Sequence, residues 1–559
     1  MIQFDESKQS RKYDQLREKE EEDALQNLSQ KYGIPYVDLT TTPINTDALI
    51  LLAESTARTA EVAVFNRLNK EIDVAMHSPE GEAAREVVMD LEARGFSVNT
   101  YLASKKSLTF AWDRFKDIQF ASESKKGMLD VSSEDINTFI KDVHTVEDVR
   151  RFIEETVHLK KAFRTSRIVE VLLASALATR SSDIHIEPEE KQVRLRMRLD
   201  GILTDVSFFD HETYRLLLSR LKLLSGLKLN IQSEAQDGRF SIKIDPSDIE
   251  IRTSILPGQY GESVVMRVLN PDSISVSIEK LGMRDDLRAV LEHEITKPNG
   301  MILTTGPTGS GKTTTLYAFL KRVHSPEVKI ITIEDPVEYH LPGIVQTQVD
   351  AEKNYTFESG LRAAVRQDPD IIMVGEIRDN ETAEIAIHAA LTGHLVFSTL
   401  HTNSAAGAFT RLIDIGINSR ILGSAINVAL AQRLVRTLCP ACKKEIPIPD
   451  ERRALVERIL SDVGDPTKIA GIQREKVFEA GPGCAECGGD GYKGRIGLFE
   501  AIVMNETIER IVEESPSERE IRKAAREQGF LSLSQDAILR VLEGTTTFEE
   551  IERVVDLSV

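Results

Sequence analysis

The stretch that decides the fold is GMILTTGPTGSGKT, residues 300–313. Residues 306–313 match the phosphate-loop pattern, in which two glycines allow backbone N–H groups to wrap around an anion. The apolar residues 301–303 predict a buried strand before the loop, and Thr313–Val323 predict a helix after it. Such a helix directs the positive end of its dipole at the anion. The alternative, a glycine-rich turn that matches by chance, is disfavoured by the flanking strand and helix.

The chemistry expected of this loop is the binding of ATP and Mg²⁺. Lys312 is placed to reach the β- and γ-phosphates, and the hydroxyl of Thr313 is placed to bind Mg²⁺. We therefore predict that the nucleotide-binding residues of the loop are Gly306, Pro307, Thr308, Gly309, Ser310, Gly311, Lys312, Thr313 and Thr314.

Downstream of the loop, apolar strands alternate with helical patterns, which predicts a parallel sheet with crossover helices and therefore an α/β fold. The predicted strand Lys329–Ile333 runs into an acidic cluster at residues 334–338, and the predicted strand Asp370–Val374 is followed by Glu376. Ligands of open α/β sheets bind outside the carboxyl ends of the strands. We therefore expect both groups of carboxylates at the nucleotide site.

Besides the phosphate loop, phosphoryl transfer needs groups that align the attacking water and bind the metal, and carboxylates can perform both roles. We predict that Glu338 orients the attacking water and that Glu376 belongs to the magnesium shell, and the reverse assignment stays open. Glu334 and Asp335 are predicted to contribute to nucleotide binding. A kinase is less well supported, because the sequence contains no visible motif for a second, acceptor substrate.

Two histidines, His394 and His401, bracket the predicted strand Leu395–Leu400. A single histidine near a strand is more often structural than catalytic. Two histidines at the ends of a strand beside a phosphate loop make sensing of the γ-phosphate an equal alternative.

The four cysteines form two C-x₂-C pairs, Cys439 with Cys442 and Cys484 with Cys487, separated by a long insertion. Four thiolates at this spacing suit tetrahedral Zn²⁺. The alternatives are two disulfides or four unrelated thiols, and a reducing compartment disfavours the disulfides. The insertion is predicted to contain a helix, Arg452–Val463. The chain from about residue 496 is predicted to be helical and carries no chemical motif.

Length and composition describe an ordinary soluble chain of several domains. The 559 residues are 41% hydrophobic and 28% charged, which is enough for three or four domains with cores of their own. No apolar run approaches the roughly 18–20 residues of a membrane span. The first residues are too charged for a signal peptide, which predicts a cytoplasmic protein. The net charge of −19 argues against a general nucleic-acid binder, although a local basic patch stays possible.

The chain upstream of the loop is divided by composition into four segments. The segments are a charged leader at 1–25, an α/β domain at 26–120, a polar linker at 121–160 and a second α/β domain at 161–275. The elements predicted in the first domain and the linker are helices Ala24–Tyr32, Glu82–Arg94 and Val146–Lys161, an edge strand Ile34–Leu39 and strands Ile72–Met76 and Phe96–Val98.

The second domain carries a strictly alternating segment, Val193–Gly201, with apolar residues on one face and arginines on the other. The arginine face is interpreted as solvated. A hairpin is predicted further on, with strands Ile249–Thr253 and Val264–Val268 around the turn Leu256–Gly261.

The chain resembles the assembly ATPases of type II secretion and type IV pilus systems, from about residue 30 to its C-terminus. The segments that carry the resemblance are YGIPYVDL, SSDIHIEP, VRLRMRLDG, QDGRFS, GPTGSGKTTTLY, TIEDPVEY, VRQDPDIIMVGEIRD, TGHLVFSTLHTN, AQRLVRTLCPAC and the glycine-flanked second cysteine pair, in the order typical of the family. The family's names for four of these segments are Walker A at 306–313, Asp box at 334–338, Walker B at 370–376 and His box at 394–401.

The resemblance implies an architecture. It implies a RecA-like P-loop core at 276–435, preceded by a PAS-like domain at 161–275 and an N-terminal docking domain at 26–120. A tetracysteine zinc module at 436–495 and a helical subdomain at 496–559 would follow. It further implies a homohexamer that docks on an inner-membrane platform protein, at the inner face of the cytoplasmic membrane and with no membrane contact of its own.

The resemblance also implies roles for Arg252 and Arg267, which lie where the family places arginines that complete the nucleotide site. Many relatives begin with an Arg-Leu-Gly-type motif that takes part in binding cyclic di-GMP. The leader of this chain has no such motif, so that this ligand is not carried over.

Two functions follow as hypotheses. The first is an ATPase motor that drives the assembly of a pilus or of a secretion pseudopilus. The second is a zinc-bearing translocase that acts on DNA, which the acidic net charge disfavours. Stimulation of ATP hydrolysis by DNA would discriminate between them.

Overall fold

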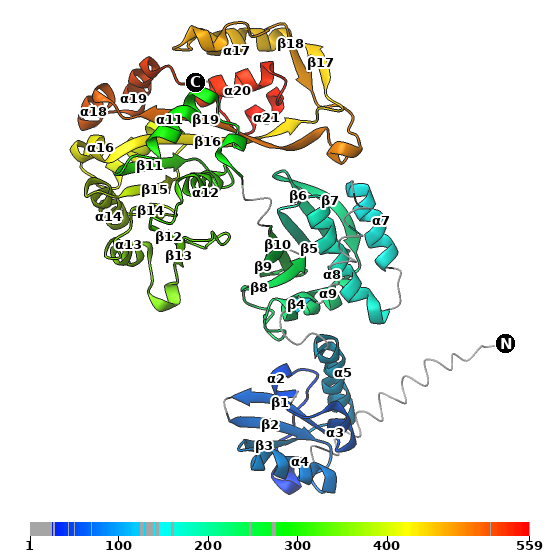
Figure 1. Cartoon of the computed structure of the whole chain (residues 1–559). Helices are drawn as coiled ribbons and strands as arrows, with labels where there is room; N and C mark the ends of the chain where they lie inside the picture. Colours follow the sequence, from blue (N-terminus) through cyan, green and yellow to red (C-terminus); the bar gives the residue numbers. More distant parts are fainter. Residues whose placement is uncertain are drawn as a thin grey trace, which may run out of the picture.

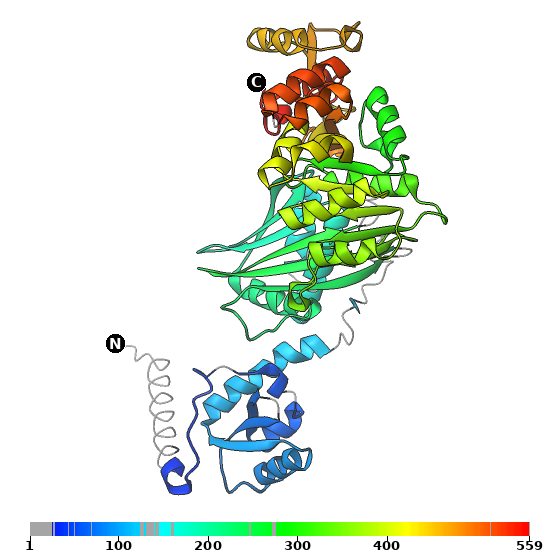
Figure 2. The same ribbon diagram turned by 90° about the vertical axis from the view of Figure 1, so that its left-hand side faces the viewer.

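The computed structural model describes residues 28–42, 44–49, 51–68, 70–122, 128–129, 145–157, 161–244, 247–270, 276–514 and 516–557, together with Leu25, Phe139 and Val143. The predicted leader, apart from Leu25, and about half of the predicted linker lie outside these residues. The chain forms an N-terminal α/β unit, a middle unit on a seven-stranded sheet and a large C-terminal unit on a second seven-stranded sheet (Figures 1 and 2). Among the described residues, no helix combines the length and the apolar character that a membrane span requires.

The N-terminal unit is built on a three-stranded sheet in the order β1-β2-β3. Its elements are α2 (Thr46–Leu49), α3 (Glu54–Thr59), β1 (Val62–Leu68), β2 (Glu71–Met76), α4 (Glu82–Ala93), β3 (Ser97–Leu102) and α5 (Lys105–Ser122). Strand β2 pairs antiparallel with β1 and parallel with β3. The predicted strands and the helix between them are confirmed, with α4 ending one residue early.

The predicted edge strand at residues 34–39 is wrong. Tyr36 makes only a single bridge to Leu102, because Pro35 has no N–H to donate. The chain then leaves the sheet at Asp38, whose carboxylate accepts from the backbone N–H of Thr40 at 2.9 Å. This local hydrogen bond turns the backbone and ends the pairing.

The middle unit has the strand order β4-β8-β9-β10-β5-β6-β7. Its elements are β4 (Met128–Leu129), α7 (Val146–Val157), α8 (Lys161–Ala178), β5 (Asp183–Pro188), β6 (Val193–Leu199), β7 (Ile202–Phe209), α9 (His211–Leu224), β8 (Gln236–Ile244), β9 (Ser247–Gly258) and β10 (Gly261–Leu269). Alternation in β6 buries Val193, Leu195 and Met197, as predicted. The arginine face is ion-paired rather than merely solvated: Arg194 meets Asp205 at 2.7 Å and Arg196 meets Glu187 at 2.5 Å.

The C-terminal unit has the strand order β13-β12-β14-β15-β11-β16-β19. Its strands are β11 (Gly300–Thr305), β12 (Ile330–Glu334), β13 (Val345–Gln348), β14 (Ile371–Val374), β15 (Leu395–Leu400), β16 (Ile426–Leu438) and β19 (Tyr492–Val503). All neighbouring pairs are parallel except β16 with β19. The helices that precede and connect them are α11 (Asp285–Glu294), α12 (Lys312–Val323), α13 (Phe357–Val365), α14 (Asn380–Leu391), α15 (Ala405–Asp414) and α16 (Ser419–Ala425). The predicted parallel sheet with crossover helices is therefore confirmed.

The sheet takes its last strand from beyond the cysteine pairs. Residues 496–503, predicted to be helical, belong to β19 and pair antiparallel with β16. Leu498 and Ile502 are buried against the core, so that tertiary burial decides the conformation of a segment with a weak local pattern. The predicted helical tail holds from Glu506 on, with α18 (Glu506–Glu513), α19 (Glu518–Ala525), α20 (Leu533–Leu542) and α21 (Phe548–Glu552).

The insertion between the cysteine pairs forms a small layer at the end of the C-terminal unit. Strands β17 (Lys444–Pro447) and β18 (Lys476–Glu479) pair antiparallel, and α17 (Asp450–Ser461) lies between them in the sequence (Figure 1). The helix predicted in the insertion is confirmed.

Candidate nucleotide site and cysteine cluster

The phosphate loop joins the carboxyl end of β11 to the first turn of α12. Gly306, Gly309 and Gly311 have φ angles of 151°, 80° and 90°, which side-chain-bearing residues rarely adopt. A Cβ at Gly306 would also lie 2.6 Å from the carbonyl oxygen of Gln432. The loop therefore needs glycine for its backbone angles and for its close contact with β16.

Lys312 is buried inside the loop. Its ammonium donates to the carbonyl oxygens of Gly306 at 2.8 Å and Pro307 at 3.2 Å. Burial lowers the pKa of Lys312, the carboxylate of Glu376 opposes that shift, and the charge of Arg433 adds to it. The ammonium is thus held by neutral oxygens only, and phosphate oxygens are stronger acceptors for it.

Glu376 and His401 come together at the same edge of the sheet as the loop. Glu376 follows β14, and its Oε2 lies 3.3 Å from Nε2 of His401, which follows β15. Arg378 donates to the other oxygen of Glu376. Because β11, β14 and β15 are parallel, their carboxyl ends share one edge, and this places Lys312, Glu376 and His401 at the same edge of the sheet.

His394 does not lie at this edge of the sheet, which argues against its predicted role as a phosphate sensor. It precedes β15, and the register places Gly300 beside Leu395 and Thr305 beside Leu400. His394 therefore lies at the edge where β11 begins, opposite the phosphate loop. Its Nδ1 lies 3.0 Å from the carbonyl oxygen of Ala389, which makes it a structural residue.

Glu334 is also placed differently from the prediction of a nucleotide contact. Its side chain is only 2% exposed, and both carboxylate oxygens already have donors. Thr332 donates to Oε1 at 2.5 Å, Gln346 donates to the same oxygen at 3.2 Å, and Tyr317 donates to Oε2. Burial raises the pKa of Glu334. The residue holds α12, β12 and β13 together, while its neighbour Asp335 is exposed.

Arg252 of the middle unit reaches the predicted Asp box. Its Nη1 lies 3.7 Å from Oε2 of Glu338, and its Nη2 donates to the carbonyl oxygen of Val337. Arg267 is the cross-strand partner of Arg252 but does not reach Glu338. Its guanidinium pairs with Asp183 at 3.1 Å, and its side chain is 60% exposed. The structure thus brings one of the two predicted arginines to the site.

The sequence analysis missed two polar residues of β16 that lie behind the loop. Gln432 accepts from the hydroxyl of Thr315 at 2.7 Å. Arg433 is buried and donates to the carbonyl oxygens of Asn403 at 3.0 Å and Val554 at 3.1 Å, which ties the segment after the His box to the C-terminal segment. Two adjacent polar residues inside the apolar run of β16 were the signal available in the sequence.

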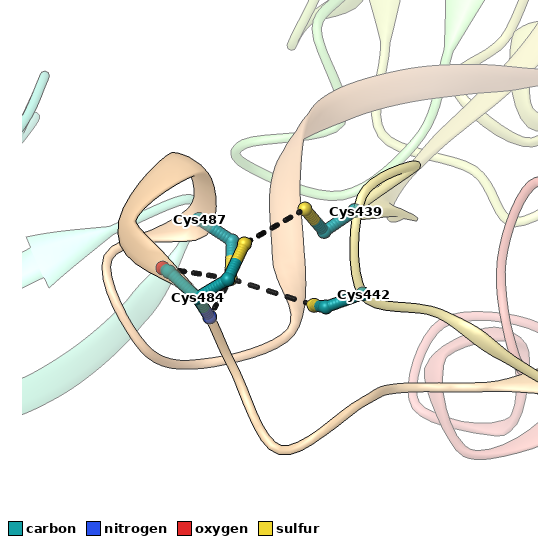
Figure 3. Close-up of side chains that lie close together, drawn as sticks. All are labelled: Cys439, Cys442, Cys484 and Cys487. Atoms are coloured by element: carbon teal, nitrogen blue, oxygen red, sulfur yellow. Dashed lines mark hydrogen bonds between the residues drawn. The ribbon is translucent and has the colours of Figure 1, made fainter.

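The four cysteines converge, although 41 residues separate the two pairs. Figure 3 shows the side chains of Cys484 and Cys487 facing those of Cys439 and Cys442. The Sγ–Sγ distances are 3.7 Å for Cys439–Cys484 and 3.8 Å for Cys442–Cys487 and Cys484–Cys487, and all four sulfurs lie within 4.8 Å.

These distances decide between the alternatives. A disulfide requires an S–S distance of about 2.05 Å. Four sulfurs at about 2.3 Å from a central Zn²⁺ are separated by about 3.8 Å from one another. The cluster therefore fits a tetrahedral metal site and excludes the two-disulfide alternative.

The backbone around the cluster favours a thiolate at Cys487. The N–H groups of Cys484 and Gly491 donate to Sγ of Cys487 at 3.1 and 3.3 Å. Burial raises the pKa of Cys487, but these donors outweigh burial and lower it to about 6. Cys442, in contrast, has its pKa raised to about 12, first by burial and then by its contacts with the other sulfurs. A bound dication would supply the charge that four clustered thiolates need.

Comparison with known proteins identifies the family of this chain, which the geometry of the two sites does not. The profile of the family described as type II/IV secretion system protein matches residues 159–553, more than half of the chain. The chain belongs to this family. It is an ATPase of the secretion and pilus type, with the mixed α/β architecture that the sequence predicted. Residues 32–121 match a second profile, the MshEN domain.

Two curated relatives show how far the similarity extends. Type II secretion system protein E of Pseudomonas aeruginosa is 45% identical over 388 residues, which cover 69% of this chain and 75% of that protein. Type IV pilus assembly ATPase PilB of Myxococcus xanthus is 37% identical over 529 residues, which cover 94% of this chain and 89% of that protein.

Among solved structures, the ATPase DotB of Yersinia pseudotuberculosis aligns with a TM-score of 0.50 and 19% identity. The alignment covers 70% of this chain and 94% of that one. At this identity the likeness shows the fold alone.

Proposed function

We propose that this ATPase is a hexameric motor in the cytoplasm, at the inner face of the cytoplasmic membrane, that powers filament assembly on an inner-membrane platform protein. The observation that carries the proposal is the meeting of Lys312, Glu376 and His401 at one sheet edge in a chain of this family. Phosphoryl transfer depends on such positioned charges more than on covalent chemistry by the protein.

Each part of ATP hydrolysis is assigned to residues of this chain. Lys312 and the backbone N–H groups of residues 308–314 would bind the phosphates of ATP, and the hydroxyl of Thr313 together with Glu376 would hold Mg²⁺. The metal, when bound, neutralises the charge that develops on the phosphates. Glu338 orients the attacking water, and Arg252 restrains the Glu338 side chain through its 3.7 Å contact. Glu376, next to His401, remains the alternative for the water.

A filament of the type IV pilus class is favoured over a secretion pseudopilus by the extent of the matches. The PilB relative aligns with 94% of the chain, including its N-terminal unit, whereas the protein E relative aligns with 69%. Deleting the gene and restoring it as the wild type or as Lys312→Ala tests this. The wild type restores surface pili and the variant does not; loss of protein secretion with normal pili would overturn the assignment to pili.

The proposed ring gives a role to Arg267, whose side chain is largely exposed although its guanidinium pairs with Asp183. A guanidinium that is 60% exposed can reach the phosphates of a nucleotide in a neighbouring subunit. An arginine supplied in trans is worth about 10³–10⁵ in rate for P-loop enzymes. Turnover per subunit is expected to rise with protein concentration as rings form, and Arg267→Ala is expected to remove that rise. Equal specific activity in demonstrably monomeric protein would contradict the ring.

We also propose that the cluster Cys439, Cys442, Cys484 and Cys487 holds one structural Zn²⁺. The sulfur geometry and the lowered pKa of Cys487 support a tetrahedral thiolate site.

A DNA translocase is the second candidate, and two observations disfavour it. The net charge is −19, and on β6 the arginines 194 and 196 are paired with carboxylates of the same sheet. ATP hydrolysis measured with and without double-stranded DNA separates the two functions, because a translocase is stimulated by DNA and a filament motor is not.

A further inference from the structure

Gln346 on the edge strand β13 makes an unusual number of side-chain hydrogen bonds. Its Nε2 lies 3.2 Å from Oε1 of Glu334, 3.1 Å from the carbonyl oxygen of Tyr339 and 3.4 Å from the hydroxyl of Tyr317. Its Oε1 accepts from the backbone N–H of Leu341 at 2.6 Å. Because that N–H can only donate, it fixes which way the amide of Gln346 faces.

The backbone groups that Gln346 binds belong to the segment directly after Glu338. One amide thus binds Tyr339 and Leu341, one and three residues beyond the carboxylate proposed to orient water. On the other side of Glu338, Arg252 donates to the carbonyl oxygen of Val337. The backbone on both sides of Glu338 is therefore held by hydrogen bonds to side chains.

The same bonds connect this segment to the helix of the phosphate loop. Tyr317 lies in α12, five residues after Lys312, and donates to Glu334. Its ring packs edge-on against the ring of Tyr339, with centroids 4.7 Å apart. The buried carboxylate of Glu334 is the common acceptor of Tyr317 and Gln346. A continuous set of contacts thus joins α12 to the Glu338 segment.

We propose that Gln346 is a positioning residue for ATP hydrolysis, which sets the place of Glu338 relative to the phosphate loop. The proposal rests on the proposed function, because it takes Glu338 as the group that orients the water. Geometry matters at this level because a misplacement of about 1 Å can cost about 10²-fold in rate. The proposal assigns Gln346 no direct contact with nucleotide or water, because its hydrogen bonds go to Glu334, Tyr317 and the backbone of the Glu338 segment.

The test compares Gln346→Met with Gln348→Met. Gln348 lies on the same strand and is exposed, so that its replacement controls for the loss of an amide on β13. Gln346→Met is expected to lower kcat by about 10-fold or more, with the affinity for ATP unchanged within about twofold. Gln348→Met is expected to leave kcat, KM and Tm as in the wild type.

A purely structural role has a different signature. If Gln346→Met lowers Tm and weakens ATP binding in step with kcat, or if kcat is unchanged, the positioning role is overturned. Tyr317→Phe removes one donor to Glu334 but keeps the ring contact, and is expected to lower kcat less than Gln346→Met does.

A double variant separates this proposal from the assignment of Glu338. If Gln346 acts through Glu338, Glu338→Gln combined with Gln346→Met turns over no more slowly than Glu338→Gln alone. Additive losses in the double variant contradict the positioning role. Full activity of Glu338→Gln alone would instead overturn the proposed role of Glu338, on which the inference rests.

Discussion

The nucleotide edge and the cysteine cluster are two sites assembled in opposite ways. Every residue of β11, β14 and β15, which lead to the nucleotide edge, is buried. In the loop that carries the second cysteine pair, none of residues 481–490 is buried. The first site is positioned by strands packed into an apolar core. In the second site only the first cysteine pair has such support, because Cys439 is buried directly after β16. Its four sulfurs lie at the separations expected around a tetrahedral Zn²⁺.

Because of this difference, we expect the structure of the cysteine cluster, and not that of the nucleotide edge, to depend on a bound ligand. Because the strands that precede Lys312 and Glu376 are buried, we expect both residues to keep their places whether or not nucleotide is bound. The cysteine loops have little to bury, so that metal-binding energy becomes folding energy there, about 10–16 kcal/mol for structural zinc in small peptides. Changes at one site are therefore expected to leave the other largely intact.

The largest effect is expected at the nucleotide edge. Lys312→Ala removes the cation that meets the phosphates, and we expect ATP hydrolysis to fall by at least about 100-fold. The fold and the zinc content are expected to stay those of the wild type, because the strands around the loop remain buried. Steady-state ATPase assays and metal analysis on the same preparation check both points. Turnover at the wild-type rate would refute the site assignment.

Glu376→Gln is expected to separate binding from turnover. The amide keeps the size of the side chain but loses the negative charge. In the wild type this charge faces His401 and opposes the lowering of the Lys312 pKa by burial. We expect turnover to fall by about 100-fold, with ATP affinity within about threefold of the wild type. A fluorescent ATP analogue measures affinity and a coupled assay measures turnover. A parallel loss of both would show that Glu376 supports the loop instead of the reaction.

The cysteine cluster is expected to respond locally. Cys442→Ser removes one thiolate, and we expect the zinc content to fall from one ion per chain and residues 436–495 to exchange amide hydrogens faster. ATP affinity should change by no more than about twofold, because these loops contribute no strand to the nucleotide edge. Hydrogen exchange with metal analysis tests this. Metal-free protein with unchanged protection of residues 436–495 would contradict a structural zinc.

The smallest effects compare the two histidines. His401→Asn removes the partner of Glu376, and we expect turnover to fall by about 10-fold. His394→Asn lies at the opposite edge of the sheet and is expected to change turnover by less than about twofold. Steady-state kinetics of both variants at saturating ATP provides the measurement. Equal losses would mean that the histidines act on stability and not on the reaction.

The sequence predicts a feature correctly where local backbone chemistry and the direction of a strand are enough to decide it. The spacing of glycines with Lys312 predicts a phosphate loop, because the backbone angles it needs exclude other residues. Glu376 follows an apolar run, and carboxyl ends of parallel strands share an edge. The same rule should have placed His394 at the far edge, since it precedes its strand. The misassignment of residues 496–503 arose from a pattern too weak to predict burial.

The α/β fold, the phosphate loop and the candidate metal ligands follow from the amino-acid sequence alone. Three features depend on tertiary packing. Gln346 binds the segment after Glu338, Glu334 is buried with both carboxylate oxygens bonded, and Arg252 contacts Glu338 while Arg267 pairs with Asp183. The physical reason is the separation along the chain of the residues that decide each feature. Backbone angles and strand direction are fixed by neighbouring residues, whereas a side chain's partners depend on which distant segments burial brings beside it.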